Sequence, residues 1–171
     1  MLDTAIQAAK EGGGILEKYF QSSLLERKLK DDKTIVTQAD EEIEKRIIEI
    51  IKKDYPTHAF LAEESGQEDT GSDYAWIIDP IDGTRNFANG IPIFAISIAL
   101  VKDDEPIASV IYNPITKDLF SAEKGRGAFW NSRKIGVSTQ QADKAMITLG
   151  PSQKPEDNAF LHRYFSHAKQ Y

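Results

Sequence analysis

Apolar residues recur at helical spacing through residues 1–55. Between residues 2 and 25 they return every three or four positions, which predicts an amphipathic helix. A run of three glycines at residues 12–14 interrupts this pattern, and each glycine costs a helix roughly 1 kcal/mol relative to alanine. We therefore expect this helix to pack closely against a neighbouring element at the glycines.

A second helix is predicted after a charged connector over residues 28–33. Thr37 or Asp40 could cap this helix, and acidic residues follow in its first turn, where they favour helix formation. The helix ends before Pro56. Its apolar face consists of four isoleucines, at positions 43, 47, 50 and 51.

From residue 58 onward the pattern changes to short extended runs separated by turn residues. The predicted strands span residues 59–62, 74–78, 94–101, 107–112, 119–122, 128–130 and 146–149. A polar loop over residues 63–72 follows the first strand, and a last helix is expected over residues 158–169. Helices followed by antiparallel strands indicate an α+β fold, here one domain with a helical part at 1–55 and an antiparallel sheet part at 58–150.

Composition narrows the classes of function. The formal net charge of −6 argues against binding to nucleic acid or to an anionic membrane, because phosphate surfaces attract clustered Lys and Arg. The chain has no cysteine, which excludes thiolate zinc sites and cysteine nucleophiles. No signal peptide is recognised, and the longest apolar stretch, residues 91–101, is too short to span a bilayer. A cytoplasmic location is the expectation.

The densest chemical signal follows the predicted strand that ends at residue 78. Asp79, Pro80, Ile81 and Asp82 place two carboxylates and a carbonyl on one rigid turn, and Gly83 permits an otherwise costly backbone angle. Such hard oxygen donors suit Mg²⁺. Asp-Pro and Asp-Gly alone are common turn dipeptides, but two carboxylates at the end of a buried strand need a partner, which a cation supplies.

Other acidic residues leave more than one interpretation open. Glu63 and Glu64 directly follow an apolar strand, so a ligand from this loop could complete a two-metal site, although a solvated acidic loop is the simpler interpretation. Asp40 is most simply interpreted as a helix cap. His58 is interpreted as a strand-edge residue without a catalytic role. A calcium-binding module is disfavoured because no EF-hand spacing occurs.

These segments, in this order, resemble the inositol monophosphatase family of lithium-sensitive sugar phosphatases. Residues 76–87 match every fixed position of its signature Trp-x-x-Asp-Pro-[Ile/Leu]-Asp-Gly-Thr-x-Asn-Phe, and residues 63–65 resemble its paired-glutamate motif. Residues 30–40 are similar to its Lys-x-Asp-x-[Ser/Thr]-Pro-Val-Thr-x-Ala-Asp segment, with isoleucine in place of the proline. Residues 125–131 resemble a further hairpin of the family.

The resemblance implies roles for individual residues. The magnesium ligands would be Glu63, Asp79, Asp82 and the Ile81 carbonyl, and the complete enzyme would hold two or three Mg²⁺ ions. Glu63 and Thr84 would position the attacking water, and Asp40 would pair with the Thr84 hydroxyl. Glu63, Ile81, Asp82, Gly83 and Thr84 would also contact substrate, with the backbone N–H groups of Gly83 and Thr84 holding phosphate oxygens at a helix start.

The implied fold is a layered α/β sandwich of the inositol monophosphatase/fructose-1,6-bisphosphatase type, with its first layers present. The implied function is a Mg-dependent phosphomonoesterase that hydrolyses a small sugar or inositol phosphate by in-line attack of metal-activated water. Fructose 1,6-bisphosphate and 3′-phosphoadenosine 5′-phosphate are alternative substrates. The expected partners are a small phosphorylated metabolite and a second copy of the chain in a homodimer, with no nucleic acid and no membrane.

The resemblance also implies what the chain lacks. Family members carry, in a further C-terminal half, a Trp-Asp-x-Ala-Ala-Gly-type motif whose aspartate is another metal ligand, and nothing between residues 135 and 171 resembles it. We therefore expect one metal position to be weak and an apolar sheet face to be exposed. An inactive truncated fragment is the competing interpretation.

Overall fold

A computed structural model describes residues 1–20, 27–29, 35–139 and 141 of the chain. The chain divides into two compact units, Met1–Gly136 and Val137–Tyr171. The first unit holds every helix and strand described below. The strand predicted over residues 146–149 and the helix predicted over residues 158–169 lie outside the described residues.

Helix α1 spans Leu2–Tyr19. The prediction of a helix to residue 25 is wrong at Phe20, whose backbone is extended (φ −62°, ψ 122°), and residues 21–25 lie outside the described part. The Phe20 ring packs against Phe87 and Phe94, with ring centroids 6.1 and 5.2 Å away. Phe20 thus packs against the hydrophobic core just beyond the end of the helix.

Helix α2 spans Gln38–Asp54 and packs along α1. Glycines let α1 approach its neighbours closely on two sides. A Cβ atom on Gly12 would lie 3.0 Å from Ile43 Cγ2 of α2. One on Gly13 would lie 2.6 Å from Cε1 of Tyr112, in the strand Glu105–Asn113 of the sheet. The expected close packing is therefore confirmed at these two positions. At Gly14, by contrast, an added Cβ atom would meet no other atom within 4 Å.

The main sheet has eight strands in the order β10-β9-β8-β7-β6-β5-β3-β4. Their bounds are β3 Ala59–Ala62, β4 Gly66–Glu68, β5 Tyr74–Asp82, β6 Ala95–Lys102, β7 Glu105–Asn113, β8 Asp118–Glu123, β9 Gly127–Trp130 and β10 Arg133–Ile135. The prediction of a purely antiparallel sheet is wrong at one pairing, because β3 runs parallel to β5. The intervening segment 63–73 crosses back along the sheet and contributes the short edge strand β4.

A second, two-stranded sheet pairs β1, Arg27–Leu29, with β2, Ile35–Thr37, in antiparallel register. The prediction of a connector over residues 28–33 is therefore wrong at residues 28 and 29. Strand β2 leads directly into α2. Among the described residues, no helix combines the length and the apolar character needed to cross a bilayer.

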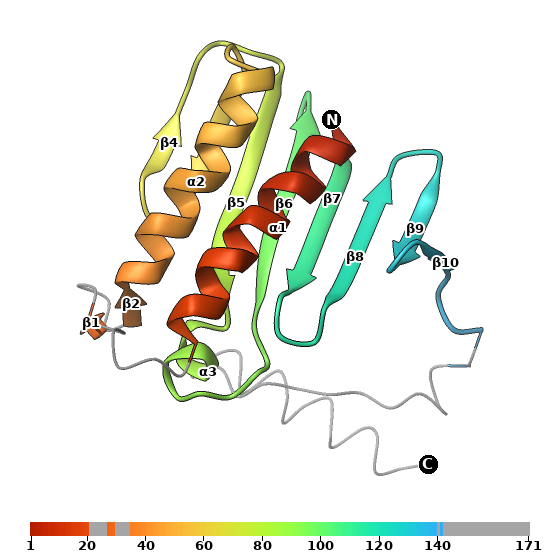
Figure 1. The fold of residues 1–171 in the computed structure, drawn as a ribbon. Helices are drawn as coiled ribbons and strands as arrows, with labels where there is room; N and C mark the ends of the chain where they lie inside the picture. Colours follow the sequence, from red (N-terminus) through yellow and green to blue (C-terminus); the bar gives the residue numbers. More distant parts are fainter. Residues whose placement is uncertain (21–26, 30–34, 140, 142–171) are drawn as a thin grey trace, which may run out of the picture. The chain divides into compact units, whose positions relative to one another are not determined.

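Helices α1 and α2 lie side by side over one face of the main sheet (Figure 1). Side chains that point to these helices alternate along the strands and are buried, as with Trp76, Ile78, Ile98 and Val110. The opposite face carries large apolar side chains that stay exposed: Leu61 (47%), Ile77 (40%), Ile111 (48%), Phe120 (39%) and Trp130 (41%). The sheet thus presents the exposed apolar face that the sequence led us to expect.

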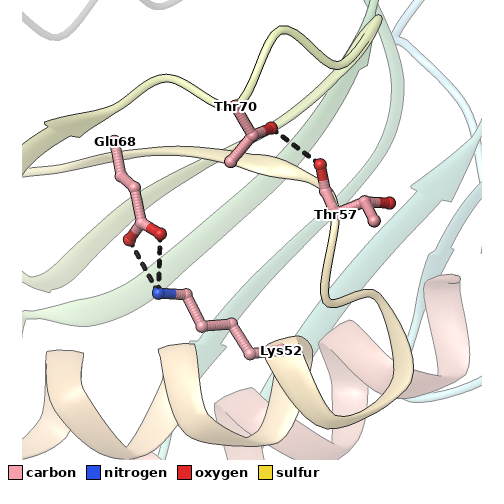
Figure 2. Close-up of polar contacts among 4 residues, drawn as sticks. All are labelled: Lys52, Thr57, Glu68 and Thr70. Atoms are coloured by element: carbon pink, nitrogen blue, oxygen red, sulfur yellow. Dashed lines mark hydrogen bonds and ion pairs between the residues drawn. The ribbon is translucent and has the colours of Figure 1, made fainter.

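Polar contacts join the hairpin of β3 and β4 to the end of α2 and to the segment that follows α2. Figure 2 shows Lys52 of α2 reaching Glu68 of β4, with Nζ at 2.7 and 2.9 Å from the two carboxylate oxygens. The Thr70 hydroxyl donates a hydrogen bond to the Thr57 carbonyl at 2.7 Å. Strand β4 lies within the predicted polar loop, and polar side chains rather than apolar burial attach it to α2 and the segment after it.

Candidate functional site

The signature segment forms the end of β5 and the bend that follows it. Along the ladder with β6, Asp79 lies opposite Ser97 and Asp82 lies opposite Ala95, with a shift of register between them. Asp79 Oδ1 accepts a hydrogen bond from the Ile81 N–H at 3.1 Å. This bulge turns the chain so that Ile81 is buried while Asp82 faces solvent.

Gly83 makes the bend possible. Its φ of +97° lies in the left-handed region, and a Cβ there would sit 3.0 Å from the Ile93 carbonyl oxygen. Gly83 is the N-cap of the five-residue helix α3, Thr84–Ala88. Thr84 is the first residue of this helix, and its hydroxyl donates a hydrogen bond to the Ile81 carbonyl at 3.0 Å.

The β3–β4 turn brings Glu63 to the same end of the sheet. Strands β3 and β5 run parallel, so their carboxyl ends meet at one edge, and the Glu63 N–H continues their ladder by donating to the Ile78 carbonyl at 3.1 Å. Glu63 and Asp82 are exposed to solvent, whereas Asp79 between them is half-buried. The parallel pairing, which the sequence did not reveal, is what makes the two motifs neighbours.

The pKa of the Asp79 carboxyl reflects how close Glu63 and Asp82 lie to it. Burial raises the pKa of the Asp79 carboxyl to about 7, aided by the negative charge of Glu63, a hydrogen bond with the Glu63 side chain and the charge of Asp82. The hydrogen bond from the Ile81 N–H acts in the opposite direction. Glu63 and Asp82 are thus held close enough to Asp79 to disfavour its ionisation.

The oxygen donors of this cluster are of the kind that binds a hard divalent cation. Carboxylate oxygens and a backbone carbonyl are the ligands that Mg²⁺ takes, and the Ile81 carbonyl keeps a second lone pair beside its bond to Thr84. In the part of the chain that the structure describes, no three acidic, histidine or cysteine side chains are already arranged around a common metal position. Glu63 and Asp82 are the exposed members and would have to turn toward Asp79 to complete such a set.

Asp40 lies on α2 and is almost fully buried, with 1% of its surface exposed. It is the third residue of the helix, so its interpretation as an N-cap is wrong. One helical turn later, Glu44 is also buried, and both its carboxylate oxygens accept backbone N–H groups of the turn after Glu63. Glu44 was not among the candidate residues predicted from the sequence. Its spacing of four residues from Asp40, on the isoleucine-lined face, was the available signal.

A pocket with a cavity volume of about 480 Å³ opens beside the bend at Asp82 and Gly83. Its walls come from α3, from the segment before β6 and from strands β7 and β8. Asn86 and Asn113 line it, and their amide groups donate to the carbonyls of Ile93 and Pro92, at 2.7 and 3.1 Å. These bonds fix the wall of the pocket next to Gly83.

His58 is buried away from solvent and takes a structural role consistent with its place at the start of β3. Its Nδ1 accepts a hydrogen bond from Trp76 Nε1 at 3.0 Å. Its ring stacks on Tyr74 and Tyr55, with centroids 4.8 and 4.9 Å away. Burial lowers the pKa of the imidazole. His162 and His167 lie outside the described residues.

The chain is similar to known proteins along most of its length. The sequence profile of the Inositol monophosphatase family matches residues 1–171. The chain is 41% identical over 159 residues to a fructose-1,6-bisphosphatase/inositol-1-monophosphatase of Aquifex aeolicus, and 41% identical over 149 residues to the Nus factor SuhB of Haemophilus influenzae. The crystal structure of the extragenic suppressor protein suhB from Bartonella henselae superposes with a TM-score of 0.75 at 43% identity.

The matched region is nearly all of this chain but only part of each relative. It covers 91% of this chain and 60% of the Aquifex protein, and 86% of this chain and 56% of the Haemophilus protein. For the Bartonella structure the values are 81% and 54%. The chain therefore spans between half and two thirds of the length of these relatives.

Proposed function

Because the chain belongs to the inositol monophosphatase family, we propose that it carries the cation- and phosphate-binding part of a Mg-dependent phosphomonoesterase acting on a small sugar or inositol phosphate. One observation carries the proposal. Glu63 and Asp79, sixteen residues apart in the chain, are brought into hydrogen-bonding contact with Asp82 beside them. Mutual repulsion makes such a cluster unfavourable by itself, and a divalent cation removes that cost.

In this proposal, Glu63, Asp79, Asp82 and the Ile81 carbonyl hold the cation. When bound, Mg²⁺ would supply Lewis-acid polarisation of the phosphoryl oxygens and a lowered pKa for a coordinated water. Asp79 is half-buried, so its carboxylate would stay in place when the cation binds. The exposed side chains of Glu63 and Asp82 would turn toward it.

The remaining groups orient the reactants. The first N–H groups of α3, at Gly83 and Thr84, have no partner inside the helix and would hold phosphate oxygens. Thr84 would orient the attacking water together with Glu63. For this the Thr84 hydroxyl, which donates to the Ile81 carbonyl, would accept a hydrogen bond from that water. The expected pairing of Asp40 with this hydroxyl would require the hydroxyl proton to turn from the Ile81 carbonyl to the Asp40 carboxylate.

The size of the pocket next to Gly83 is consistent with a small substrate. Its volume of about 480 Å³ lies in the range of small-molecule sites. The Aquifex relative is named for both fructose 1,6-bisphosphate and inositol 1-phosphate hydrolysis, which favours testing these two first. 3′-Phosphoadenosine 5′-phosphate is a third candidate. A homodimer, a cytoplasmic location and the absence of nucleic-acid partners stay predictions, and one relative carries the name Nus factor SuhB.

The proposal is tested by phosphate release from these three substrates with and without Mg²⁺. We expect phosphate release to depend on Mg²⁺ and to be lost in the Asp79→Asn variant. Because the chain spans part of its relatives' length, the assay is run on this chain and on a chimera completed with the C-terminal part of the Aquifex relative. Absence of release by the chimera on every substrate would refute the proposed function.

A further inference from the structure

Glu44 is a buried acidic residue in the middle of α2, with 3% of its surface exposed. Its neighbours on that face of the helix, Ile43 and Ile47, are completely buried. A carboxylate in such a place costs free energy unless its oxygens are hydrogen-bonded. An apolar side chain would serve helix packing better, so the presence of Glu44 calls for a specific partner.

That partner is the backbone of the β3–β4 turn. Glu44 Oε2 accepts the Glu64 N–H at 2.7 Å, and Oε1 accepts the Ser65 N–H at 2.8 Å. Hydrogen bonds to a carboxylate are stronger than those between neutral groups. Two of them to successive N–H groups fix both the position and the orientation of the turn relative to α2.

The residue just before these two N–H groups is Glu63. Its own N–H is held by the Ile78 carbonyl of β5, so its main chain is fixed from the sheet on one side and from α2 on the other. This matters because the Glu63 side chain lies against Asp79 and near Asp82, both of like charge. Repulsion would displace a loosely held turn away from them.

We propose that Glu44 is a positioning residue for the cation site: it holds the backbone of residues 63–65 so that the Glu63 carboxylate stays beside Asp79. This inference rests on the proposed function, since it concerns the same cation. Glu44 does not contact the cation or the substrate in this account. It acts through the turn, as outer groups that orient metal ligands do elsewhere.

The same hairpin supplies a matched control. Lys52, eight residues after Glu44 on α2 and therefore about 12 Å along the helix, binds Glu68 at the other end of the hairpin (Figure 2). Lys52→Met removes a tether of the hairpin without touching the turn after Glu63. Glu41→Gln removes one negative charge from an exposed position of the same helix.

The experiment compares Glu44→Gln, Glu44→Asp and the two controls by calorimetric titration with Mg²⁺ alone and by backbone amide NMR. A glutamine has one acceptor oxygen and presents an NH₂ group to the second N–H. We expect the amide proton signals of Glu64 and Ser65 to move upfield in Glu44→Gln and Mg²⁺ affinity to fall about 10–100-fold. Glu44→Asp should lie between Glu44→Gln and the wild type, and both controls should remain within about twofold of it.

Failure of this inference is distinguishable from failure of the proposed function. If the wild type binds Mg²⁺ and folded Glu44→Gln binds it equally well, the positioning role is wrong while the cation site stands. If the wild type does not bind Mg²⁺ at all, the proposed function and the inference both fall. Should Glu44→Gln not fold, Glu44→Asp decides: wild-type affinity in that variant overturns the inference, and a reduced affinity with both controls unchanged supports it.

Discussion

Gly83 offers the sharpest test of the geometry at the candidate site. Replacing it with alanine forces a side chain into the left-handed region, at φ +97°, where an L-residue pays about 1–2 kcal/mol. The new Cβ would also press on the Ile93 carbonyl oxygen at 3.0 Å and on Phe94 Cα at 3.3 Å. That oxygen cannot move freely, because it accepts the Asn86 side-chain amide at 2.7 Å.

These terms set the expected size of the effect. Overpacking of this kind costs about 1–3 kcal/mol, and the lower entropy of the unfolded alanine chain returns about 0.4–1 kcal/mol. We expect Gly83→Ala to lose about 1–5 kcal/mol of folding stability. For a chain of this size that corresponds to a melting temperature lower by roughly 2–20 °C.

Gly14→Ala is the matched control, since it makes the same chemical change in α1. A Cβ at Gly14 meets nothing within 4 Å and the residue is exposed, so alanine should stabilise the helix by about 0.5–1 kcal/mol. Urea and thermal unfolding followed by circular dichroism measure both variants. If Gly83→Ala proves as stable as Gly14→Ala, the described bend between β5 and α3 is wrong.

Three further predictions concern other parts of the fold. Gly13→Ala should be less stable than Gly14→Ala by about 1–3 kcal/mol in the same unfolding assay, because both gain helix propensity but only the Gly13 Cβ would lie 2.6 Å from Tyr112 Cε1; equal stabilities would contradict the described packing of α1 on β7. The pKa of Asp79 is raised to about 7, so without Mg²⁺ the native state binds the Asp79 proton more tightly than the unfolded state does. The stability that this protonation contributes is therefore lost as pH rises from about 4 through 7. Asp79→Asn should remove this decrease in stability and melt at a higher temperature than the wild type at pH 8 without Mg²⁺. Equal melting temperatures would contradict the close placement of Glu63 and Asp82 beside Asp79. Burial lowers the pKa of His58, so its contribution to stability is present above about pH 6.5 and is lost as pH falls below that value; the difference in unfolding free energy between wild type and His58→Gln should show this slope, and a flat difference would refute it.

The signature segment was predictable because its chemistry is local. The apolar run into Asp79, the second carboxylate at Asp82 and the glycine after it are adjacent in the sequence, and the structure places them on one bend at the end of β5. The long helix α2 was predictable for a similar reason, since its isoleucines repeat over several turns. Periodicity is strongest in such long segments.

Short and non-local features were missed. Strands β1, β2 and β10 have three residues each, too few to show alternation, and β4 is fully exposed. The parallel pairing of β3 with β5 joins segments that a loop separates, so no local pattern records it. The close contact with Ile93, which requires glycine at the N-cap of α3, also joins distant segments and left no local pattern.

Glu44 shows the limit of reading residue types alone. A glutamate inside a charged helix is ordinarily a solvated residue, and only the position of the β3–β4 turn shows what this one binds. Asp40 is a similar case, since its burial follows from how α2 lies on the sheet. In both cases the functional interpretation depends on tertiary packing that composition and spacing leave undetermined.

The central claim is that Glu63, Asp79 and Asp82 together bind a divalent cation at the end of β5. Crystals of the chain soaked in Mn²⁺, used as an anomalous scatterer in place of Mg²⁺, test it most directly. The account predicts an anomalous peak within direct bonding distance of the Glu63 and Asp79 carboxylates. A peak confined to other acidic residues, such as Glu68 and Asp69 on the same hairpin, or no peak at saturating Mn²⁺, would contradict it.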